Sequence, residues 1–470
     1  MKLTLKGRNS VAGIAIIASG ALGAMVVPAA GQEFPRSGVL LTFDISQRLE
    51  TDSNLDLDET SPGSSTIATT RFNFGVQTDN GISRLDFGLG LAIRGFDVPT
   101  RTDSADFDNP DVRFAYTREG ANAVFETRAR YIRSDITFIR PLDDPLGDPD
   151  IPDLLADLDD LRGGGWREDR FFSTRLELGT SSLIGFTIDA TYLDRRYEDV
   201  TSPDLFDNLR RSIDTETRFS VSPATDVFLR LGHERLNEFE AIPRKEQTTD
   251  LALGVRHEFS DVLRLEADVG RSWVREEIAG VVARENGIDG SFLLTHDLPT
   301  GDVGLSFVSD TDEDGTNSRL SVSRRFELPD GEFLGSIGVA RGPHGETEAI
   351  GSVDYRQVLS VGTIGVSLDR DITFSDTDGD ETLTEAALSY VFPINEVSSF
   401  GLGLSTSRLK NLDTGAREER SNIGLTYSYL LDDSWGLNVG YRHRLRDVGM
   451  GEAKSDVFFV TFSRHFDGTF

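Results

Sequence analysis

Hydrophobic and polar residues alternate with a period of two along most of the chain. From position 84 to position 94, the odd positions are leucine, phenylalanine or isoleucine, and the even positions are arginine, aspartate, glycine or alanine. Similar alternation occurs at 39–46 and at 435–442. Successive side chains of a β-strand point to opposite faces of its sheet. Each segment is therefore predicted to be a strand with one apolar face and one polar or small face.

About 22 such segments follow one another to the last residue. The connections between them alternate in length along the sequence. Short turns are predicted at 79–81, 118–122, 180–181, 222–225, 298–301, 328–331 and 431–434. Longer, acidic loops are predicted between them at 50–64, 96–109, 134–167, 195–207, 237–247, 310–316, 373–381 and 445–455. Short and long connections in alternation indicate an up-and-down antiparallel meander with an even number of strands.

The polar faces indicate which side of this meander meets water. They carry arginines and carboxylates in strand after strand, and twenty or so strands enclose too much volume for side chains to fill. We therefore expect the apolar faces to contact lipid and the charged faces to line a wet lumen. Because hydrocarbon does not tolerate an open sheet edge, the sheet should close. The predicted fold is all-β, a transmembrane antiparallel up-and-down β-barrel of about 22 strands (range 18–22), with short periplasmic turns and long acidic extracellular loops.

The first 31 residues have the composition of a secretory signal peptide. Lys2, Lys6 and Arg8 form a basic start, an apolar run follows at 11–27, and small residues at 29–31 suit a cleavage site. An uncleaved membrane anchor is the alternative. We predict that residues 1–31 are removed and that 32–470 form a single barrel domain, which makes the protein an exported one.

The C-terminal segment resembles the assembly signal of Gram-negative outer-membrane β-barrels. Alternating apolar residues precede a terminal phenylalanine; the matching aromatic positions are Phe458, Phe462, Phe466 and Phe470. Arg464 and Gly468 depart from the pattern, where a bulkier apolar residue would be usual. The resemblance identifies a superclass, porin-like in architecture, and not a single family. It implies a location in the outer membrane, contact with its lipid and lipopolysaccharide, and insertion by the barrel-assembly machinery.

The charged faces supply the candidate functional residues. Arginine, whose planar guanidinium suits fixed positions on a wall, provides nearly all the cations. A water-filled pore could use such an internal field to select solutes by charge. Alternatively, the charges pair across neighbouring strands and merely solvate the interior. The candidates for lining the lumen are Arg84, Asp86, Arg94, Arg128, Arg130, Arg175, Arg218, Arg230, Arg256 and Arg264.

The longest predicted loop, 134–167, is similar to the inward-folded constriction loop of general porins. Its segment 152–161 places four leucines on one face of a short helix, and three glycines at 163–165 would end that helix. Placement on the outer surface as an exposed acidic loop is the alternative. The candidate constriction residues are Asp143, Asp144, Asp148, Asp150, Asp153, Asp157, Asp159 and Asp160.

Composition excludes several kinds of chemistry. The 470 residues contain no cysteine, which excludes disulfides, zinc ribbons and thiol catalysis, and the net charge of −31 argues against nucleic-acid binding. Two acidic loops resemble calcium-binding loops but have Ser321 and Ala387 where a bidentate glutamate is needed. We expect no cofactor beyond weak divalent binding, with solvated loops as the alternative. The residues concerned are Asp310, Asp312, Asp314, Asp376, Asp378 and Asp380.

These features together predict a porin-like channel for passive diffusion of small hydrophilic solutes or ions, in which homotrimers are possible. The six histidines are scattered and no nucleophile motif is present, so we do not expect an enzyme. The first strand begins soon after the leader, which leaves no room for a plug and argues against a TonB-dependent receptor. The alternatives are a barrel that exports or anchors a surface polymer with periplasmic partners, or a structural or adhesion protein of the cell surface.

Overall fold

The computed structural model describes residues 38–102, 105–106, 109–138, 164–200, 202, 205–239, 241–374, 380–449 and 451–470. Within these residues it contains 23 β-strands and one 3-10 helix, η1 (Ile136–Phe138). None of the described helices is long and apolar enough to cross a membrane. The predicted leader, 1–31, lies outside the described residues, so its removal stays a prediction.

The strands follow one another along the chain in the order of their numbers. The first twelve are β1 (Val39–Asp52), β2 (Ser65–Asp79), β3 (Ser83–Asp97), β4 (Ala105–Asp106), β5 (Asp111–Gly120), β6 (Ala123–Asp135), β7 (Trp166–Leu178), β8 (Ile184–Glu198), β9 (Asn208–Ser222), β10 (Thr225–Glu238), β11 (Arg244–Ser260) and β12 (Leu263–Ile278). The others are β13 (Val281–Leu298), β14 (Gly301–Thr311), β15 (Thr316–Leu328), β16 (Gly331–Arg341), β17 (Thr347–Val358), β18 (Thr363–Thr373), β19 (Glu381–Asn395), β20 (Ser398–Asn411), β21 (Arg417–Leu430), β22 (Trp435–Asp447) and β23 (Glu452–Thr469).

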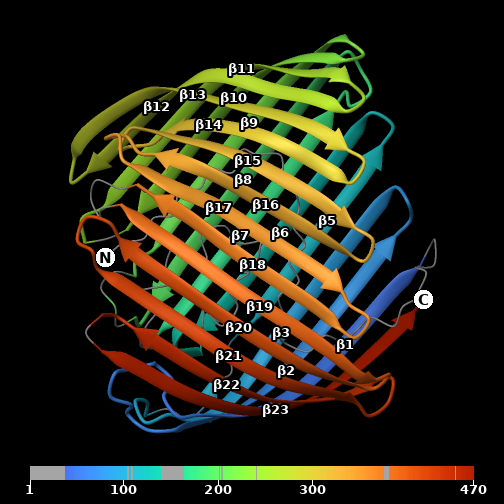
Figure 1. Cartoon of the computed structure of the whole chain (residues 1–470), viewed down its shortest axis with the longest axis vertical. Coiled ribbons are helices and arrows are strands. Elements are labelled where there is room, and N and C mark those ends of the chain that lie inside the picture. Colours follow the sequence, from blue (N-terminus) through green and yellow to red (C-terminus); the bar gives the residue numbers. More distant parts are fainter. Residues whose placement is uncertain are drawn as a thin grey trace.

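The strands close into a barrel (Figure 1). Each long strand pairs antiparallel with its neighbours in sequence, and β1 pairs with β23 from Leu40 opposite Thr469 to Asp52 opposite Val457. The two-residue β4 pairs only with the end of β3, which itself pairs directly with β5. The wall therefore has 22 strands, which confirms the predicted all-β, closed antiparallel barrel.

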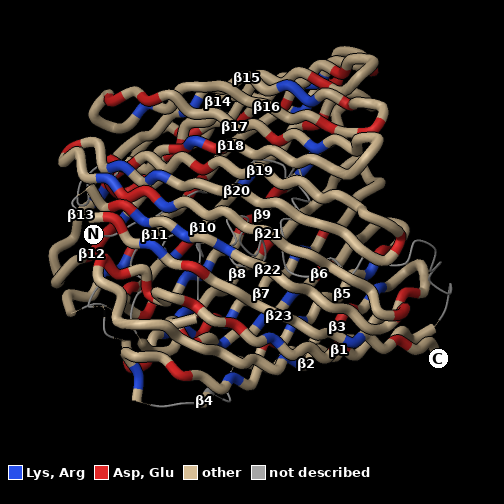
Figure 2. Tube along the Cα trace, turned by 60° about the horizontal axis from the view of Figure 1, so that its bottom comes forward, with Lys and Arg blue, Asp and Glu red and all other residues tan. Residues whose placement is uncertain are grey.

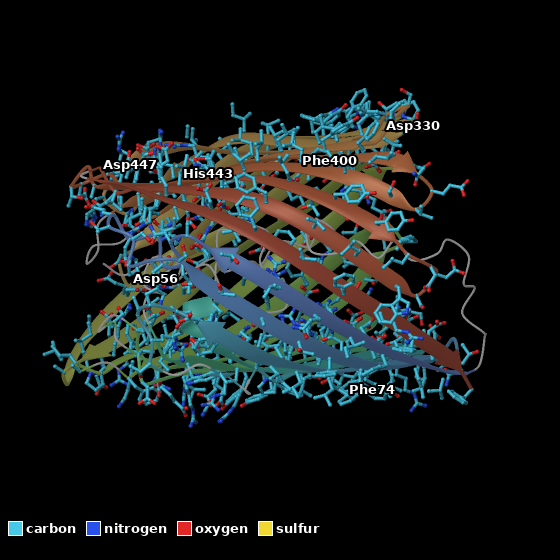
Figure 3. All side chains as sticks on the ribbon, turned by 90° about the horizontal axis from the view of Figure 1, so that it is seen from below. Asp56, Phe74, Asp330, Phe400, His443 and Asp447 are labelled. Atoms are coloured by element: carbon cyan, nitrogen blue, oxygen red, sulfur yellow. The ribbon has the colours of Figure 1, made fainter. Side chains whose placement is uncertain are left out.

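The two ends of the barrel differ in their connections. The short turns lie at one end, here called the turn end, together with Phe470, whose backbone N–H donates to the carbonyl of Val39 at 3.0 Å. The longer connections lie at the other end, here called the loop end. Figure 3 shows Asp330 at the turn end, and Asp56 and Asp447 at the loop end.

The outer surface is apolar in the middle of the wall. On β3, Leu89 and Leu91 are 45% and 39% exposed, whereas Ala92, which points to the opposite face, is 2% exposed. Phe74 and Phe400 lie on the outside of the wall in Figure 3. Large exposed hydrophobic residues on one face of successive strands form the surface that a bilayer covers.

Within the described residues, the interior has no continuous hydrophobic core. Small clusters of buried apolar residues lie near the loop end, and one of them contains Leu55, Ile67, Phe96 and Val98. These clusters form where loops fold onto strand ends, whereas Phe228 is buried outside them on the polar lumen wall. These clusters position the loops and leave the middle of the lumen to polar side chains.

Several predicted loops are shorter than expected. The connection expected at 237–247 covers only 239–243, and the connection between β12 and β13, where no loop was predicted, consists of Ala279 and Gly280 alone. Both residues have positive φ values, 51° and 82°, as a two-residue hairpin turn requires. Strand pairing continues beyond the apolar surface, where polar residues on both faces hide the period of two. The sequence pattern therefore located the lipid-facing part of each strand better than its end.

Candidate functional site in the barrel lumen

The candidate lumen residues all lie on the face of the wall opposite the exposed apolar side chains. Residues directly opposite one another in neighbouring strands share a face. Arg230 is opposite Glu216, and Arg256 is opposite both Asp226 and Glu266. The same register places the other candidates on the lumen face: Arg84, Asp86, Arg94, Arg128, Arg130, Arg175, Arg218 and Arg264. Any role of these residues in selecting a solute stays a prediction.

Near the turn end, the arginines pair with carboxylates on the same or a neighbouring strand. Arg84 Nε lies 2.9 Å from Asp86 Oδ2, and Arg264 Nη2 lies 2.8 Å from Asp297 Oδ1. Arg175 pairs with carboxylates on its own strand and on β8. Such exposed ion pairs each contribute about 0–1 kcal/mol. They cover the wall with charge but hold it together only weakly.

Arg218 fastens a turn. Its Nη2 donates to the carbonyl oxygens of Gly179 at 2.9 Å, and of Thr180 and Ser182 at 3.3 Å each. These three acceptors belong to the connection between β7 and β8. Arg218 therefore has a structural role, because it satisfies the backbone carbonyls of a turn. The alternation of polar and apolar residues alone could not distinguish this role from solute selection.

A cluster of paired charges spans β9 to β12 on the lumen wall. The carboxylate of Glu216 accepts hydrogen bonds from both Nη atoms of Arg256, at 2.6 and 2.9 Å, and from Nη2 of Arg230, at 3.3 Å. Arg256 also donates to Glu266 at 3.1 Å. Both guanidinium groups lie over the ring of Phe228, which is fully buried beneath them. Desolvation by that ring strengthens the pairing and fixes the arginines in place.

At the loop end, aromatic rings and arginines form a patch on the lumen side of β3, which we call the mouth patch: Phe96, Phe138, Arg94 and Arg101. The guanidinium of Arg94 lies 4.7 Å from the centroid of the Phe138 ring, and that of Arg101 lies 4.6 Å from the centroid of the Phe96 ring. Arg101 also pairs with the buried Asp135. Phe96 is only 5% exposed, whereas Arg94, Arg101 and Phe138 are half-buried, so the patch presents mainly its two cations and Phe138 at the loop end.

Two buried ion-pair groups escaped the sequence analysis. In the first, the carboxylate of Asp169 accepts hydrogen bonds from Nε of Arg167 at 2.8 Å and from Nε of Arg195 at 2.7 Å. All three side chains are at most 3% exposed. Arg167 and Asp169 are two positions apart, so their side chains lie on the same face of a strand, and this spacing could have predicted the pair. Arg167 was instead expected in the loop 134–167, and the pair was therefore not predicted.

The second buried group closes the barrel. Arg444 on β22 donates to Asp52 Oδ2 on β1 at 2.5 Å and to the carbonyl oxygens of Asn54 and Leu55 at 3.2 and 3.3 Å. Ser455 on β23 donates to the same aspartate. Partners so far apart in sequence have no local signal, so only the closed barrel reveals this group.

The opposite wall of the lumen is acidic. Asp369 and Glu385 are directly opposite each other on β18 and β19, and Asp354 and Asp371 face the lumen close by. Arg319 reaches Asp371 at 3.4 Å. Within β16, β18, β19 and β20, whose residues are all described, no arginine faces the lumen. Figure 2 shows acidic and basic residues interleaved along the wall and gathered at the loop end.

The candidate constriction residues are at 143–160 and lie outside the described residues, so their position in the lumen stays a prediction. Of the candidate calcium ligands, Asp376 and Asp378 also lie outside. Asp312 Oδ1 accepts the backbone N–H groups of Asp314 and Gly315 at 3.0 and 3.1 Å, and so caps its own loop. Among the described residues, no three acidic or histidine side chains are grouped to hold a metal ion. Weak divalent binding stays a prediction.

The four phenylalanines of the proposed assembly signal all lie on the outer face of β23 or directly after it. Phe458, Phe462, Phe466 and Phe470 are 59%, 47%, 40% and 82% exposed. Phe466 packs beside Phe43 of β1, with ring centroids 5.9 Å apart. An exposed aromatic row on the last strand is available to an insertion partner or to lipid, and its role as a signal stays a prediction.

Comparison with known proteins identifies relatives by structure alone. No family model matches the chain, and no curated protein sequence matches it. Among solved structures, the chain is similar to the ferric-catecholate import receptor Fiu of E. coli K12, with a TM-score of 0.58, 9% identity, and coverage of 92% of this chain and 81% of that chain. It is also similar to the FrpB iron transporter of Neisseria meningitidis, with a TM-score of 0.55, 9% identity, and coverage of 92% and 82%.

A third similar structure is a mutant of the ferric enterobactin receptor PfeA of Pseudomonas aeruginosa in complex with enterobactin. The TM-score is 0.54 at 9% identity, over 90% of this chain and 81% of that one. At such identities the likeness establishes the fold alone, which is that of the Gram-negative outer-membrane β-barrels to which the C-terminal resemblance pointed. These neighbours are described as receptors or as an iron transporter, and none of them as an enzyme.

The prediction of a passive porin is wrong. The barrel has 22 strands and matches receptors for iron chelates, whereas aqueous porin channels have 16–18 strands. The expected lack of room for a plug had spoken against a TonB-dependent receptor, and the strand number and the structural likeness outweigh that expectation. The comparison lends no support to the exporter or adhesion alternatives. By its architecture, this chain is a closed 22-strand barrel with the fold of Gram-negative outer-membrane β-barrels.

Proposed function

We propose that this chain forms the barrel of a receptor-type importer in the outer membrane, which takes up a compact charged ligand such as a metal chelate at the expense of cellular energy. The observation that carries the proposal is the closed 22-strand barrel, which resembles iron-chelate receptors over about nine-tenths of its length. Those structures are of a ferric-catecholate import receptor, an iron transporter and a ferric enterobactin receptor.

The lumen supports an importer better than a sieve. A 22-strand barrel is too wide for its own wall side chains to close, and outer-membrane transporters of this size contain a plug. The lumen arginines whose contacts are described above are paired with carboxylates or backbone carbonyls, so the wall is a charged, wet surface rather than a row of solute-binding cations. Such a wall suits an occupant that moves or rearranges when ligand enters.

The mouth patch is the best candidate for first contact with the ligand. Arg94 and Arg101 stack on phenylalanine rings at the loop end, where a ligand from outside arrives. Cations held over ring faces bind aromatic and anionic groups together, which iron chelates of the catechol class carry. We further propose that a signal peptide exports the chain, that the barrel-assembly machinery inserts it, and that lipopolysaccharide surrounds its loop end.

The test is energy-dependent uptake in cells. The full chain is expressed in a Gram-negative strain that lacks its own catechol-chelate receptors, and uptake of radioactive iron is measured with iron–catecholate and iron–hydroxamate chelates. We expect uptake of one chelate class that stops when a protonophore collapses the proton gradient. Uptake that ignores the protonophore, or no uptake of either class, contradicts the proposal.

Paired variants then locate the ligand site. Replacing Arg94 with glutamine should raise the KM for uptake by about threefold, since a stacked cation contributes about 0.5–1 kcal/mol. Arg101 is left unchanged because it pairs with the buried Asp135. Arg264→Gln, at the turn end, is the matched control and should leave KM unchanged. Equal effects at both ends would show that the mouth patch does not bind the ligand.

A further inference from the structure

The hairpin of β12 and β13 has an edge that no other described strand covers. β13 pairs with β12 from Val281 opposite Ile278 onward, but its pairing with β14 begins only at Gly290 opposite Ser309. Residues 281–286 are all exposed, and Val281 is 73% exposed. This hairpin lies at the loop end and belongs to the olive strands of Figure 1. We call residues 281–288 the free edge.

The neighbouring hairpin turns away from this edge. Glu313, in the connection between β14 and β15, pairs with Arg244 on β11, so that connection leans across the lumen face of β12 and β13. Gly287 makes room for it, because a Cβ there would lie 2.0 Å from the Oγ1 of Thr311 and 2.5 Å from that of Thr316. The β14–β15 hairpin is thus held inside the rim, and the outer side of the free edge stays open to water.

The turn between β12 and β13 shows which backbone groups are free. A two-residue turn with positive φ at Ala279 and Gly280 makes Ile278 and Val281 a hydrogen-bonded pair. The odd residues of the free edge therefore bond to β12, and the even residues direct their N–H and C=O groups to the open side. Ser309 Oγ, which lies on that side, donates to the carbonyl of Ile288 at 3.4 Å, as this alternation requires.

The charge beside the free edge selects a partner. The neighbouring segment 310–316 carries Asp310, Asp312, Glu313 and Asp314 and no cation. The outward side chains of the edge are the apolar Val282 and Ile288 with Arg284 and Asn286 between them, and the charge of Arg284 is balanced by Glu285 on the opposite face. Open strand edges are templates for another strand. We propose that the free edge binds an extended, cationic polypeptide segment outside the cell, which adds as a strand and places apolar residues over Val282 and Ile288.

A second copy of this chain does not fit the edge. Two barrels in one membrane are related by an axis along the membrane normal. Antiparallel pairing of the same edge from two copies needs an axis perpendicular to the sheet, which would turn one barrel upside down in the membrane. The partner is therefore a different polypeptide, and the acidic neighbours make it a basic one.

The experiment uses the full barrel in detergent micelles and a ten-residue synthetic peptide that alternates lysine and valine. A peptide that alternates glutamate and valine is the charge control. We expect saturable binding of the lysine peptide alone, together with slower hydrogen exchange at the amides of Val282, Arg284 and Asn286. Equal binding of both peptides, no binding of the lysine peptide, or unchanged exchange at these amides overturns the proposal.

Two variants at one position separate the backbone contact from side-chain effects. Asn286→Pro removes one open-side N–H and leaves the pairing with β12 intact, whereas Asn286→Ala keeps that N–H. The proline variant should bind the lysine peptide about tenfold more weakly than the alanine variant, because one hydrogen bond is lost. Equal affinities of the two variants would overturn the proposal, and the exchange measurement on the unmodified chain still decides it if the proline variant does not fold.

Discussion

Arginine side chains order the lumen wall through individually small contacts, apart from the two buried ion-pair groups at Asp169 and at Asp52. Exposed pairs such as Arg84 with Asp86 exchange partners with water at little cost. Arg444 and Asp52 are 3% and 0% exposed and join the strands on either side of the barrel seam. A buried charge that loses its partner stays uncompensated, so this pair should matter far more than its many exposed counterparts.

Replacing Arg444 with methionine should destabilise the folded barrel by about 3–5 kcal/mol, because the carboxylate of Asp52 stays buried without its cation. Urea unfolding in lipid vesicles, followed by tryptophan fluorescence, measures the change. Arg84→Met is the control and should cost less than about 1 kcal/mol. Similar losses for both variants would mean that the seam pair is as well solvated as the exposed one.

Phe470 sets a second expectation for a single residue. Replacing it with aspartate should reduce the amount of barrel in the outer membrane severalfold and leave unfolded chain in the periplasm, since the last strand would end in a charge instead of an exposed aromatic ring. Immunoblots of separated membrane fractions give the result. Phe239→Asp, at an exposed loop phenylalanine, should insert normally. Unreduced insertion of the Phe470 variant would remove the argument for a terminal signal.

At the scale of elements, lumen-facing glycines let neighbouring side chains lie flat on the wall. Phe228 of β10 lies over Gly254 of β11, where an added Cβ would be 2.2 Å from its Cζ atom. The ring then supports Arg230 and Arg256 from below. A glycine on one strand therefore positions a charge cluster that spans four strands.

Gly254→Ala should destabilise the barrel by about 1–3 kcal/mol, because Phe228 must move and its two arginines lose their support. Gly424→Ala on β21 is the matched control, since its nearest neighbouring atom is 3.9 Å away, and it should change stability by less than about 0.5 kcal/mol. Urea unfolding of both variants provides the comparison. Combining Gly254→Ala with Phe228→Leu should recover much of the loss, and a failure to do so would point to backbone strain instead.

For the whole molecule, the placement of the barrel in a membrane depends on which face of the closed sheet contacts water and which contacts lipid. The chain has no cysteine, so a single introduced thiol reports on one position. Ser367→Cys on the lumen face should react with a water-soluble thiol reagent roughly tenfold faster than Leu368→Cys on the outer face, which lipid should cover. Mass spectrometry of barrels in native membranes measures both rates. Faster labelling of the outer position would reverse the assignment of lumen and lipid faces.

Local pattern was enough for the strands and insufficient for the site. Alternation from position 84 to 94 predicts both the strand and its lumen face, because successive side chains of a strand point to opposite faces and the polar residues all fall on one of them. The sequence also placed Arg230 and Arg256 on the correct face. It could not find Asp52 beside Arg444, or Asp369 opposite Glu385, since those contacts depend on register and closure.

The sequence by itself determined an all-β chain, the apolar and charged faces of its strands and the closed barrel, because a period of two and the cost of an open edge in lipid leave few alternatives. Only the tertiary structure decided the rest. Strand pairing fixed the number of wall strands at 22 within the expected range of 18–22, and together with the likeness of the fold it overturned the porin interpretation, as lumen width depends on strand number and not on any one strand. The free edge of β13 could also be recognised only in the tertiary structure, because it results from the greater length of the β12–β13 hairpin beside the shorter β14.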